Sequence, residues 1–279
     1  MEIQKYLNFI KVEHTLFSLP LIYAGVFLAS KELPTTRILV LVLFAAIFAR
    51  IFAMTANRII DAEIDKKNPR TQNREIPSGK INYPKAYTIL FISLVLYGLS
   101  AYMISPFCLM LSPIPLVIFI IYPYMKRFTH FAHFGVGLGL SMGPLGGWIA
   151  VKNSFENLLP GALLSLFTLF WATSFDIIYS TLDEEFDRKN NLKSFPVRFG
   201  KKKSLFYTSI FQGISFLFLL LIYLLYFQNV IALFLLIIIA IIYYYEQRFA
   251  EKNVELAFFK LNAVVSFIVF LMVITQDLK

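Results

Sequence analysis

The chain has 279 residues, of which 58% are hydrophobic and only 15% are charged, and phenylalanine alone occurs 30 times. This composition is far more apolar than that of a soluble domain, and it excludes that class. In so apolar a chain we interpret the net charge of +9 as a signal of membrane topology and of affinity for anionic lipid headgroups, and not of nucleic-acid binding.

Apolar runs that are long enough to cross about 30 Å of hydrocarbon follow one another along the chain. We predict nine spans, near residues 14–30, 37–60, 84–104, 106–122, 131–151, 158–182, 204–226, 229–245 and 256–275. The sequence therefore predicts an all-α, polytopic membrane bundle that forms a single domain over residues 1–279.

The cations are distributed unevenly over the loops between these spans. Of the 26 Lys and Arg residues, 21 fall in the segments on one side and four on the other, and Arg50 remains inside the second span. By the positive-inside rule, the richer side is cytoplasmic. We therefore expect the N-terminus at the cytoplasmic side and, because the number of spans is odd, the C-terminus outside.

Two acidic motifs, 122 residues apart, end the second and sixth spans. They read DAEIDKKN at 61–68 and DEEFDRKN at 183–190, with five of eight positions identical, which suggests a parallel internal repeat. Each motif places two aspartates four residues apart, at Asp61 and Asp65 and at Asp183 and Asp187, and on a helix this spacing puts both carboxylates on one face. Such carboxylate pairs hold Mg²⁺ and leave positions for substrate phosphates.

Polar residues continue upstream of each motif at helical spacing. Arg50 and Asn57 precede the first aspartate pair, and Asp176 and Tyr179 precede the second. Burying a charge at the centre of a membrane helix costs on the order of 2.5–3.5 kcal/mol on insertion scales. We therefore expect Arg50 and Asp176 to face a cavity or each other, and not lipid.

The loops beside the acidic motifs carry the opposite charge. We expect four of their cations to bind phosphate oxygens, namely Arg74, Lys126, Arg127 and Lys193. Carboxylates for metal and cations for phosphate are the two complementary halves of a pyrophosphate site. His130 and His133 have a spacing seen in metal sites, but we interpret them as loop residues.

Both motifs resemble signatures of the UbiA family of intramembrane prenyltransferases. The first signature is matched by N-x-x-x-D-x-x-x-D at 57–65 followed by NREIPSG at 73–79, and the second by D-x-x-Y-x-x-x-D-x-x-x-D at 176–187. The loop YPYMKRFTH at 122–130, together with Arg50, is similar to the branch that prenylates 4-hydroxybenzoate. The resemblance extends from about residue 5 to the C-terminus. One position departs from the family pattern, because Asn191 stands where the family often has glycine; asparagine tolerates the left-handed backbone that such a turn needs.

The resemblance implies a nine-helix bundle around a central cavity that opens to the cytoplasmic side. It implies two Mg²⁺ ions that bridge to the pyrophosphate of a polyprenyl diphosphate, one bound by Asn57, Asp61 and Asp65 and the other by Asp183 and Asp187. Phosphate charge would be neutralised by Arg74, Lys126, Arg127 and Lys193.

Four residues are expected to act in the reaction itself. Asp61 and Asp183 would serve ionisation of the diphosphate through the metals, and Asp176 would act as a base beside the acceptor. Arg50 would hold the carboxylate of an aromatic acid, since arginine binds a carboxylate through a bidentate fork. Tyr179 is a candidate ligand of either the pyrophosphate or the acceptor.

Together with the carboxylate pairs and their cations, the resemblance to the UbiA family implies Mg²⁺-dependent transfer of a polyprenyl group to an aromatic acid in respiratory quinone biosynthesis. The favoured acceptor is 4-hydroxybenzoate. The alternatives are a dihydroxynaphthoate of menaquinone synthesis or another lipid acceptor. A more remote alternative is a divalent-cation transporter, which requires polar groups along a path to both faces. The paired acids of this sequence gather at one face only.

Overall fold

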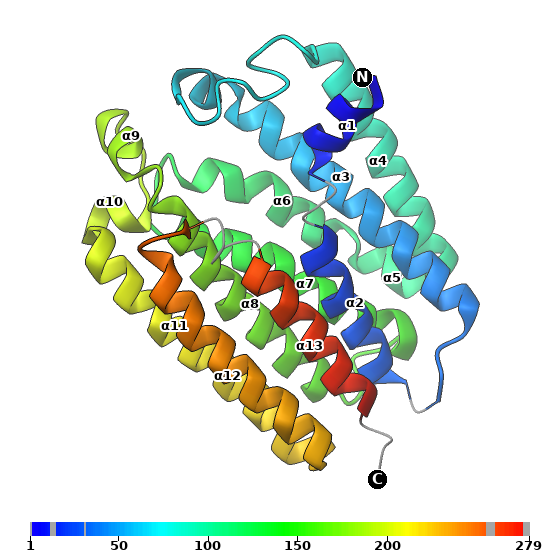
Figure 1. Ribbon diagram of the computed structural model, residues 1–279. Helices are drawn as coiled ribbons and strands as arrows, with labels where there is room; N and C mark the ends of the chain where they lie inside the picture. The colour runs from blue at the N-terminus through cyan, green and yellow to red at the C-terminus, as the bar shows by residue number, and fades with distance from the viewer. Residues whose placement is uncertain (1, 12–14, 31, 255–259, 276–279) are drawn as a thin grey trace.

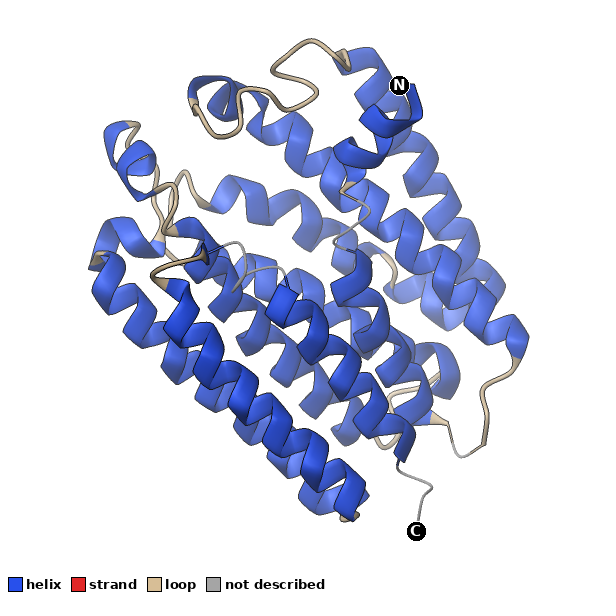
Figure 2. Cartoon of the chain, viewed as in Figure 1, coloured by secondary structure: helices blue, strands red, loops and turns tan. Residues whose placement is uncertain are grey.

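The structure, a computed structural model, describes residues 2–11, 15–30, 32–254 and 260–275. All regular secondary structure in these ranges is helical (Figure 2), which confirms the predicted all-α class. The helices are α1 (Glu2–Ile10), α2 (Thr15–Ala29), α3 (Thr36–Lys67), α4 (Tyr83–Ile104), α5 (Pro106–Leu111), α6 (Pro113–Met125), α7 (Ala132–Lys152), α8 (Leu159–Ser180), α9 (Glu184–Lys189), α10 (Phe195–Phe199), α11 (Lys201–Ile222, continued by a π-helical turn at Tyr223–Phe227), α12 (Val230–Ala250) and α13 (Asn262–Ile274).

Within the described ranges, seven helical segments are long and apolar enough to cross a membrane, with α5 and α6 together forming one of them. Two shorter apolar helices, Ser18–Ala29 within α2 and Asn262–Ile274, coincide with the first and last predicted spans. The protein is thus a multi-spanning membrane protein. The count of nine spans stays a prediction, because α2 and α13 are shorter than the usual spanning length.

Short polar side chains define where several helices begin. The side chains of Thr35, Asn82, Ser105 and Asn229 each accept a hydrogen bond from a backbone amide in the first turn of α3, α4, α5 and α12. These N-caps satisfy amide groups that have no partner within the helix. Proline at residue 113 stands at the start of α6, where a missing N–H does no harm, and it separates α5 from α6 inside one apolar run.

The helices surround a central pair, α7 and α8 (Figure 1). α7 packs against α2, α6 and α8, α8 packs against α11, and α3 packs against α4 and α6. The core centres on α8, where Phe167 and Trp171 are fully buried and their rings stack with centroids 6.0 Å apart. α9 and the loop that follows α3 lie at one end of the bundle, and α13 ends at the opposite end (Figure 1).

Glycine allows α2 and α7 to approach closely. A Cβ atom added at Gly25 on α2 would overlap the backbone carbonyl of Pro144 on α7, and one added at Gly147 would overlap the backbone carbonyl of Ile22. Small residues at a helix crossing are a common device of membrane bundles. The packing of α2 on α7 therefore depends on both glycines.

We expect Gly25→Ala to destabilise the protein by about 1–3 kcal/mol, because the added methyl group meets backbone that cannot rotate away. The matched control is Gly98→Ala on α4, where an added Cβ meets no atom of the described structure within 4 Å. Thermal unfolding in detergent measures both variants. A melting temperature for Gly25→Ala equal to that of Gly98→Ala would contradict this helix packing.

Candidate active site

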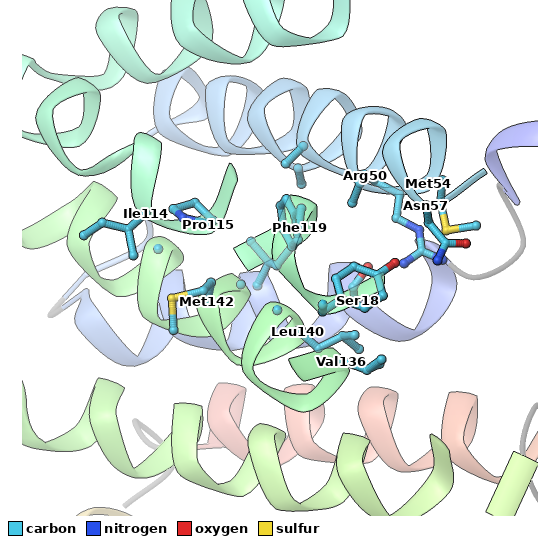
Figure 3. A pocket seen from close by; sticks show the side chains of 18 of the residues that line it. Ser18, Arg50, Met54, Asn57, Ile114, Pro115, Phe119, Val136, Leu140 and Met142 are labelled. Carbon is cyan, nitrogen blue, oxygen red and sulfur yellow. The ribbon is translucent and has the colours of Figure 1, made fainter. Parts of the chain in front are cut away.

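A cavity of about 730 Å³ lies between α3, α4, α5, α6, α7 and α8. Figure 3 shows Arg50 and Asn57 entering it from α3, Phe119 from α6 and Met142 from α7. Residues of α7 line it from Ala132 to Ala150, a distance of about 27 Å at 1.5 Å per residue. The cavity therefore extends through much of the thickness of the bundle.

The polar lining of this cavity is concentrated near the end of the bundle that carries the acidic motifs. Nine of the predicted site residues line the cavity: Arg50, Asn57, Asp61, Lys126, Asp176, Tyr179, Asp183, Asp187 and Lys193. The rest of the wall is mainly apolar, with small or aliphatic side chains from α3, α4 and α7. The expectation that Arg50 and Asp176 face a cavity is confirmed.

Three predicted residues, Asp65, Arg74 and Arg127, lie just behind the lining. The Arg74 Nη1 donates to both carboxylate oxygens of Asp65, at 2.8 and 2.7 Å. The Arg127 Nη1 lies 3.6 Å from Asp61 Oδ1. These side chains border the polar end of the cavity without being part of its wall.

Asp61 is the centre of the first carboxylate cluster. Its Oδ2 accepts hydrogen bonds from Lys126 Nζ at 2.6 Å and from Asn57 Nδ2 at 3.1 Å. The Asp61 side chain is only 5% exposed, and its Oδ1 is buried without a hydrogen-bond donor among the described residues. The cations predicted to bind phosphate thus neutralise the carboxylates predicted to bind metal.

The second carboxylate pair does not continue α8 as expected. α8 ends at Ser180, and Asp183 and Asp187 belong to the separate short helix α9, with Asp183 at its N-cap. The prediction of one helical face from Asp176 to Asp187 is therefore wrong. From Thr181 to Asp183 each backbone amide donates to the carbonyl three residues earlier, at 3.2, 3.2 and 3.0 Å, so the α-helical pattern of bonds to the fourth residue back ends there. Asp183 and Asp187 remain one turn apart, because the Asp187 amide donates to the Asp183 carbonyl at 2.8 Å.

Arg70 is a site residue that sequence reasoning did not assign. Its Nε donates to Asp183 Oδ1 at 2.9 Å, its Nη2 donates to Asp183 Oδ2, and its Nη1 donates to the Tyr179 hydroxyl at 2.6 Å. Asn68 Nδ2 also donates to Asp183 Oδ1, at 2.9 Å. Burial alone would raise the pKa of the Asp183 carboxyl, but the bonds from Arg70 and Asn68 lower it overall. The loop after α3 thereby binds directly to the second acidic motif.

A signal for Arg70 was present in the sequence. Arg70 follows the first motif within five residues of Asp65, in the loop directly after α3. The spacing could not show which carboxylate it would meet, because the contact joins segments 113 residues apart.

The two lysine-bearing loops are joined to each other. The Lys193 amide donates to the Lys126 carbonyl at 2.7 Å, and Lys193 Nζ donates to the Phe128 carbonyl at 3.1 Å. Asn191 has a φ of 56°, which confirms that asparagine supplies the left-handed turn here. This turn places Lys193 beside Lys126 at the polar end of the cavity.

Further from the aspartate pairs, Arg50, Tyr122 and Asp176 form a second polar group in the wall. Tyr122 interacts electrostatically with both Arg50 and Asp176. Arg50 Nε is buried and has no hydrogen-bond partner among the described residues, and no ion pair joins Arg50 to Asp176 there. Arg50 therefore lines the cavity without an ion pair to Asp176.

His133 corrects another expectation. Its side chain is 7% exposed in the first turn of α7, and its Nδ1 lies 2.6 Å from Asp176 Oδ2. The interpretation of His133 as a loop residue is therefore wrong, although His130 does lie in the loop before α7. His133 is helical and buried because it stands at the start of an apolar run, level with the polar end of the cavity.

The donor set suits a hard divalent cation. Asp61, Asp65, Asp183 and Asp187 offer carboxylate oxygens, and Asn57 offers an amide oxygen. The part of the chain that the structure describes has no group of three Asp, Glu, His or Cys side chains poised for a metal. Mg²⁺ is commonly held by one or two carboxylates together with waters and substrate phosphates, so two carboxylate pairs fit Mg²⁺ that arrives with a diphosphate.

Comparison with known sequences places the chain among membrane prenyltransferases. The sequence profile of the UbiA prenyltransferase family matches residues 18–272. The chain is 29% identical over 177 residues to the 4-hydroxybenzoate octaprenyltransferase of Aliivibrio fischeri (strain MJ11). That match covers 63% of this chain and 61% of the relative, so the chain spans about three fifths of that protein's length.

Two solved structures share this fold. The apo structure of a UbiA homolog from Aeropyrum pernix K1 is 29% identical, with a TM-score of 0.86 over 94% of this chain and 97% of that one. A UbiA homolog from Archaeoglobus fulgidus bound to GPP and Mg²⁺ has a TM-score of 0.73 over 97% of this chain and 99% of that one. At 18% identity, the second likeness concerns the fold alone.

Proposed function

Because the chain belongs to the UbiA prenyltransferase family, we propose that it transfers a polyprenyl group from a polyprenyl diphosphate to an aromatic acid, with 4-hydroxybenzoate as the favoured acceptor. One observation carries the proposal: a single cavity joins three carboxylates and two lysines, namely Asp61, Asp183, Asp187, Lys126 and Lys193, to a long, mainly apolar chamber. The name of the Aliivibrio fischeri relative supports this choice of acceptor. The reaction would serve respiratory quinone biosynthesis.

The polar end of the cavity binds the diphosphate. In the absence of ligand, Lys126 neutralises Asp61, Arg74 neutralises Asp65 and Arg70 neutralises Asp183. With diphosphate and Mg²⁺ bound, these carboxylates would hold the metal and these cations would bind phosphate oxygens. Lys193 and Arg127 add to the positive charge there. Each ion pair of the free protein would thus supply a carboxylate for the metal and a cation for the phosphate oxygens.

Two Mg²⁺ ions are proposed, one at Asn57, Asp61 and Asp65 and the other at Asp183 and Asp187. When bound, they stabilise the negative charge that develops on the departing pyrophosphate. The protein's own contribution is to hold the leaving group with Lys126, Lys193 and the arginines at the moment when the C1–oxygen bond breaks.

The apolar part of the cavity holds the prenyl chain and keeps water from the reacting carbon. Phe119, Met142 and Ala150 are part of this lining, and aliphatic residues of α3 and α4 complete it. An allylic cation is quenched by water, so exclusion of water directs it to the acceptor. Aromatic faces in the wall also stabilise positive charge.

The acceptor binds between these two regions. Arg50 lies seven residues before Asn57 on α3, about two turns deeper than Asn57 and three to four turns deeper than the first carboxylate pair, and its guanidinium would bind the carboxylate of the aromatic acid. Asp176 and Tyr179 line the same stretch of the wall from α8. This arrangement orients the ring so that one of its carbons reaches the prenyl C1.

The proposed orientation follows from the loops. Residues 66–85, 126–127 and 188–203 hold 15 of the 26 Lys and Arg residues, so the polar end of the cavity is assigned to the cytoplasmic side. The last residues of α13 then lie at the outer side. The membrane is a plasma membrane or an inner membrane.

A panel of acceptors tests the choice of substrate. The purified protein is incubated with a labelled polyprenyl diphosphate, Mg²⁺ and one of three acceptors: 4-hydroxybenzoate, a dihydroxynaphthoate or a lipid alcohol. We expect the label to appear in prenylated 4-hydroxybenzoate. Transfer to the dihydroxynaphthoate alone would select the menaquinone alternative, and transfer to the lipid alcohol alone would exclude an aromatic acceptor.

The need for Mg²⁺ is expected to depend on pH through Asp187. Burial raises the pKa of the Asp187 carboxyl, which lies outside the spans on α9, to about 6. Below that pH the metal must displace a proton, so the Mg²⁺ concentration for half-maximal activity should rise by up to about tenfold per pH unit. Above pH 6 it should level off. A titration of activity with Mg²⁺ at several pH values measures this, and a constant requirement on both sides of pH 6 would contradict it.

A further inference from the structure

His133 is buried beside the proposed acceptor site and has a partner on each ring nitrogen. Its Nδ1 lies 2.6 Å from Asp176 Oδ2, and its Nε2 lies 3.3 Å from the backbone nitrogen of Phe195. α7, α8 and the start of α10 therefore meet at this one imidazole. None of the roles derived above for diphosphate, metal or acceptor uses it.

The partners determine where the proton of the ring lies. A backbone N–H can only donate, so Nε2 of His133 accepts from Phe195. The single proton of a neutral imidazole is then on Nδ1, where it donates to Asp176. This bond fixes the orientation of the Asp176 carboxylate.

Asp176 retains one unused oxygen. Oδ2 is engaged by His133, whereas no described group donates a hydrogen bond to Oδ1. The Asp176 side chain is 23% exposed and lines the cavity. One oxygen of the carboxylate is thus held by His133, and the other is open to a ligand in the cavity that Arg50 also lines.

A metal role for the two histidines does not fit these contacts. The His130 Nδ1 lies 3.1 Å from the Ser194 carbonyl oxygen, and both nitrogens of His133 are occupied. His130 contacts Ser194, and His133 contacts the next residue, Phe195. Only His133 also reaches Asp176. This difference makes His130 a matched control for loss of a contact to that loop.

We propose that His133 is a positioning residue of prenyl transfer, which holds the Asp176 carboxylate toward the acceptor ring. The inference rests on the proposed function. In the reaction, the C1–oxygen bond breaks with both electrons leaving on pyrophosphate, and a π pair of the ring forms the new bond to C1. The proton on the attacked ring carbon then passes to the free oxygen of Asp176, its C–H electrons restore the aromatic ring, and the proton is later lost to solvent. His133 stays neutral throughout.

The predicted effect is on deprotonation and not on binding of the diphosphate. His133→Leu removes the donor to Asp176 and should lower kcat on the order of 10- to 100-fold, as expected for loss of one hydrogen bond to a charged group. His133→Asn places an amide N–H near the position of Nδ1 and should restore most of that loss. His130→Leu should behave as the wild type.

The deciding measurement is the rate with an acceptor deuterated at the attacked ring carbon. We expect no discrimination against deuterium by the wild type, where ionisation limits the rate, and slower turnover of the deuterated acceptor by His133→Leu. Mg²⁺-dependent binding of the diphosphate is measured in parallel and should be unchanged. An isotope effect that appears in His133→Leu and disappears in His133→Asn is specific to the positioning role. A general loosening of the fold or a misplaced loop does not predict it.

The outcomes are distinct. If the wild type prenylates the aromatic acid and His133→Leu retains full kcat without an isotope effect, the proposal is overturned while the function stands. If both His133 variants fail to bind the diphosphate while His130→Leu binds it, His133 is a structural residue and the proposal is again overturned. If the wild type prenylates no aromatic acid, the proposed function fails, and this inference fails with it.

Discussion

Replacement of Asp183 by Ala is expected to lower kcat by about 10²- to 10³-fold, the size of effect seen when one group that stabilises transition-state charge is removed. Asp183 is bound by Arg70 through both carboxylate oxygens and by Asn68. It therefore fixes the loop after α3 in the free protein and is assigned to a metal ion when the diphosphate is bound. Loss of the carboxylate removes a metal ligand and leaves Arg70 without its partner.

The neighbouring acid provides a control. Glu185 belongs to the same motif but is exposed, so Glu185→Ala should retain wild-type turnover. Steady-state kinetics with saturating Mg²⁺, alongside the amount of folded protein recovered in membranes, separates loss of chemistry from loss of fold. Full activity of Asp183→Ala would overturn the assignment of the second carboxylate pair.

Replacement of Arg50 by Met is expected to raise the KM for the aromatic acid on the order of 10- to 150-fold, which corresponds to about 1.5–3 kcal/mol for hydrogen bonds to a charged group. Binding of the prenyl diphosphate should change little. The reason is the position of Arg50 in the wall, about two turns deeper than Asn57 on α3, with its Nε unpartnered among the described residues. Methionine fills a similar volume without the charge.

Two other roles for Arg50 make different predictions. If Arg50 binds pyrophosphate, the Arg50→Met variant should bind the diphosphate more weakly. If Arg50 is a structural partner of Asp176, the variant should be less stable. The structure favours neither, since Asp176 pairs with His133 in place of Arg50. Affinities for both substrates in the variant decide between them, and an unchanged affinity for the acid would reject the acceptor role.

The fold class and the position of the first acidic motif beside the cavity were predictable because both depend on local pattern, whereas the roles assigned to the site residues stay predictions. Apolar runs alone locate the helices, and Asn57, Asp61 and Asp65 lie along a single helix, α3, where spacing translates directly into position. The left-handed turn at Asn191 was predictable for the same reason. The parallel repeat remains a prediction drawn from the two motifs.

The second half of the site was less predictable because it depends on contacts between distant segments. The backbone of α8 changes from α-helical bonds to a tighter turn between Thr181 and Asp183, which the acidic spacing does not reveal. Arg70 meets Asp183, 113 residues away, and His133 meets Asp176, 43 residues away. Charge and hydropathy indicate that such residues lie at one membrane level, but only the packing of the helices and loops shows which of them touch.

The central claim is that the two carboxylate pairs and their cations form one Mg²⁺–diphosphate site that drives prenyl transfer. The most direct measurement is the transfer of a labelled prenyl group by the purified protein in lipid vesicles, after treatment with a chelator and again after Mg²⁺ is restored. We predict no prenylated 4-hydroxybenzoate with the chelator and recovery of the product with Mg²⁺. Product formed at an undiminished rate in the chelator would contradict the claim.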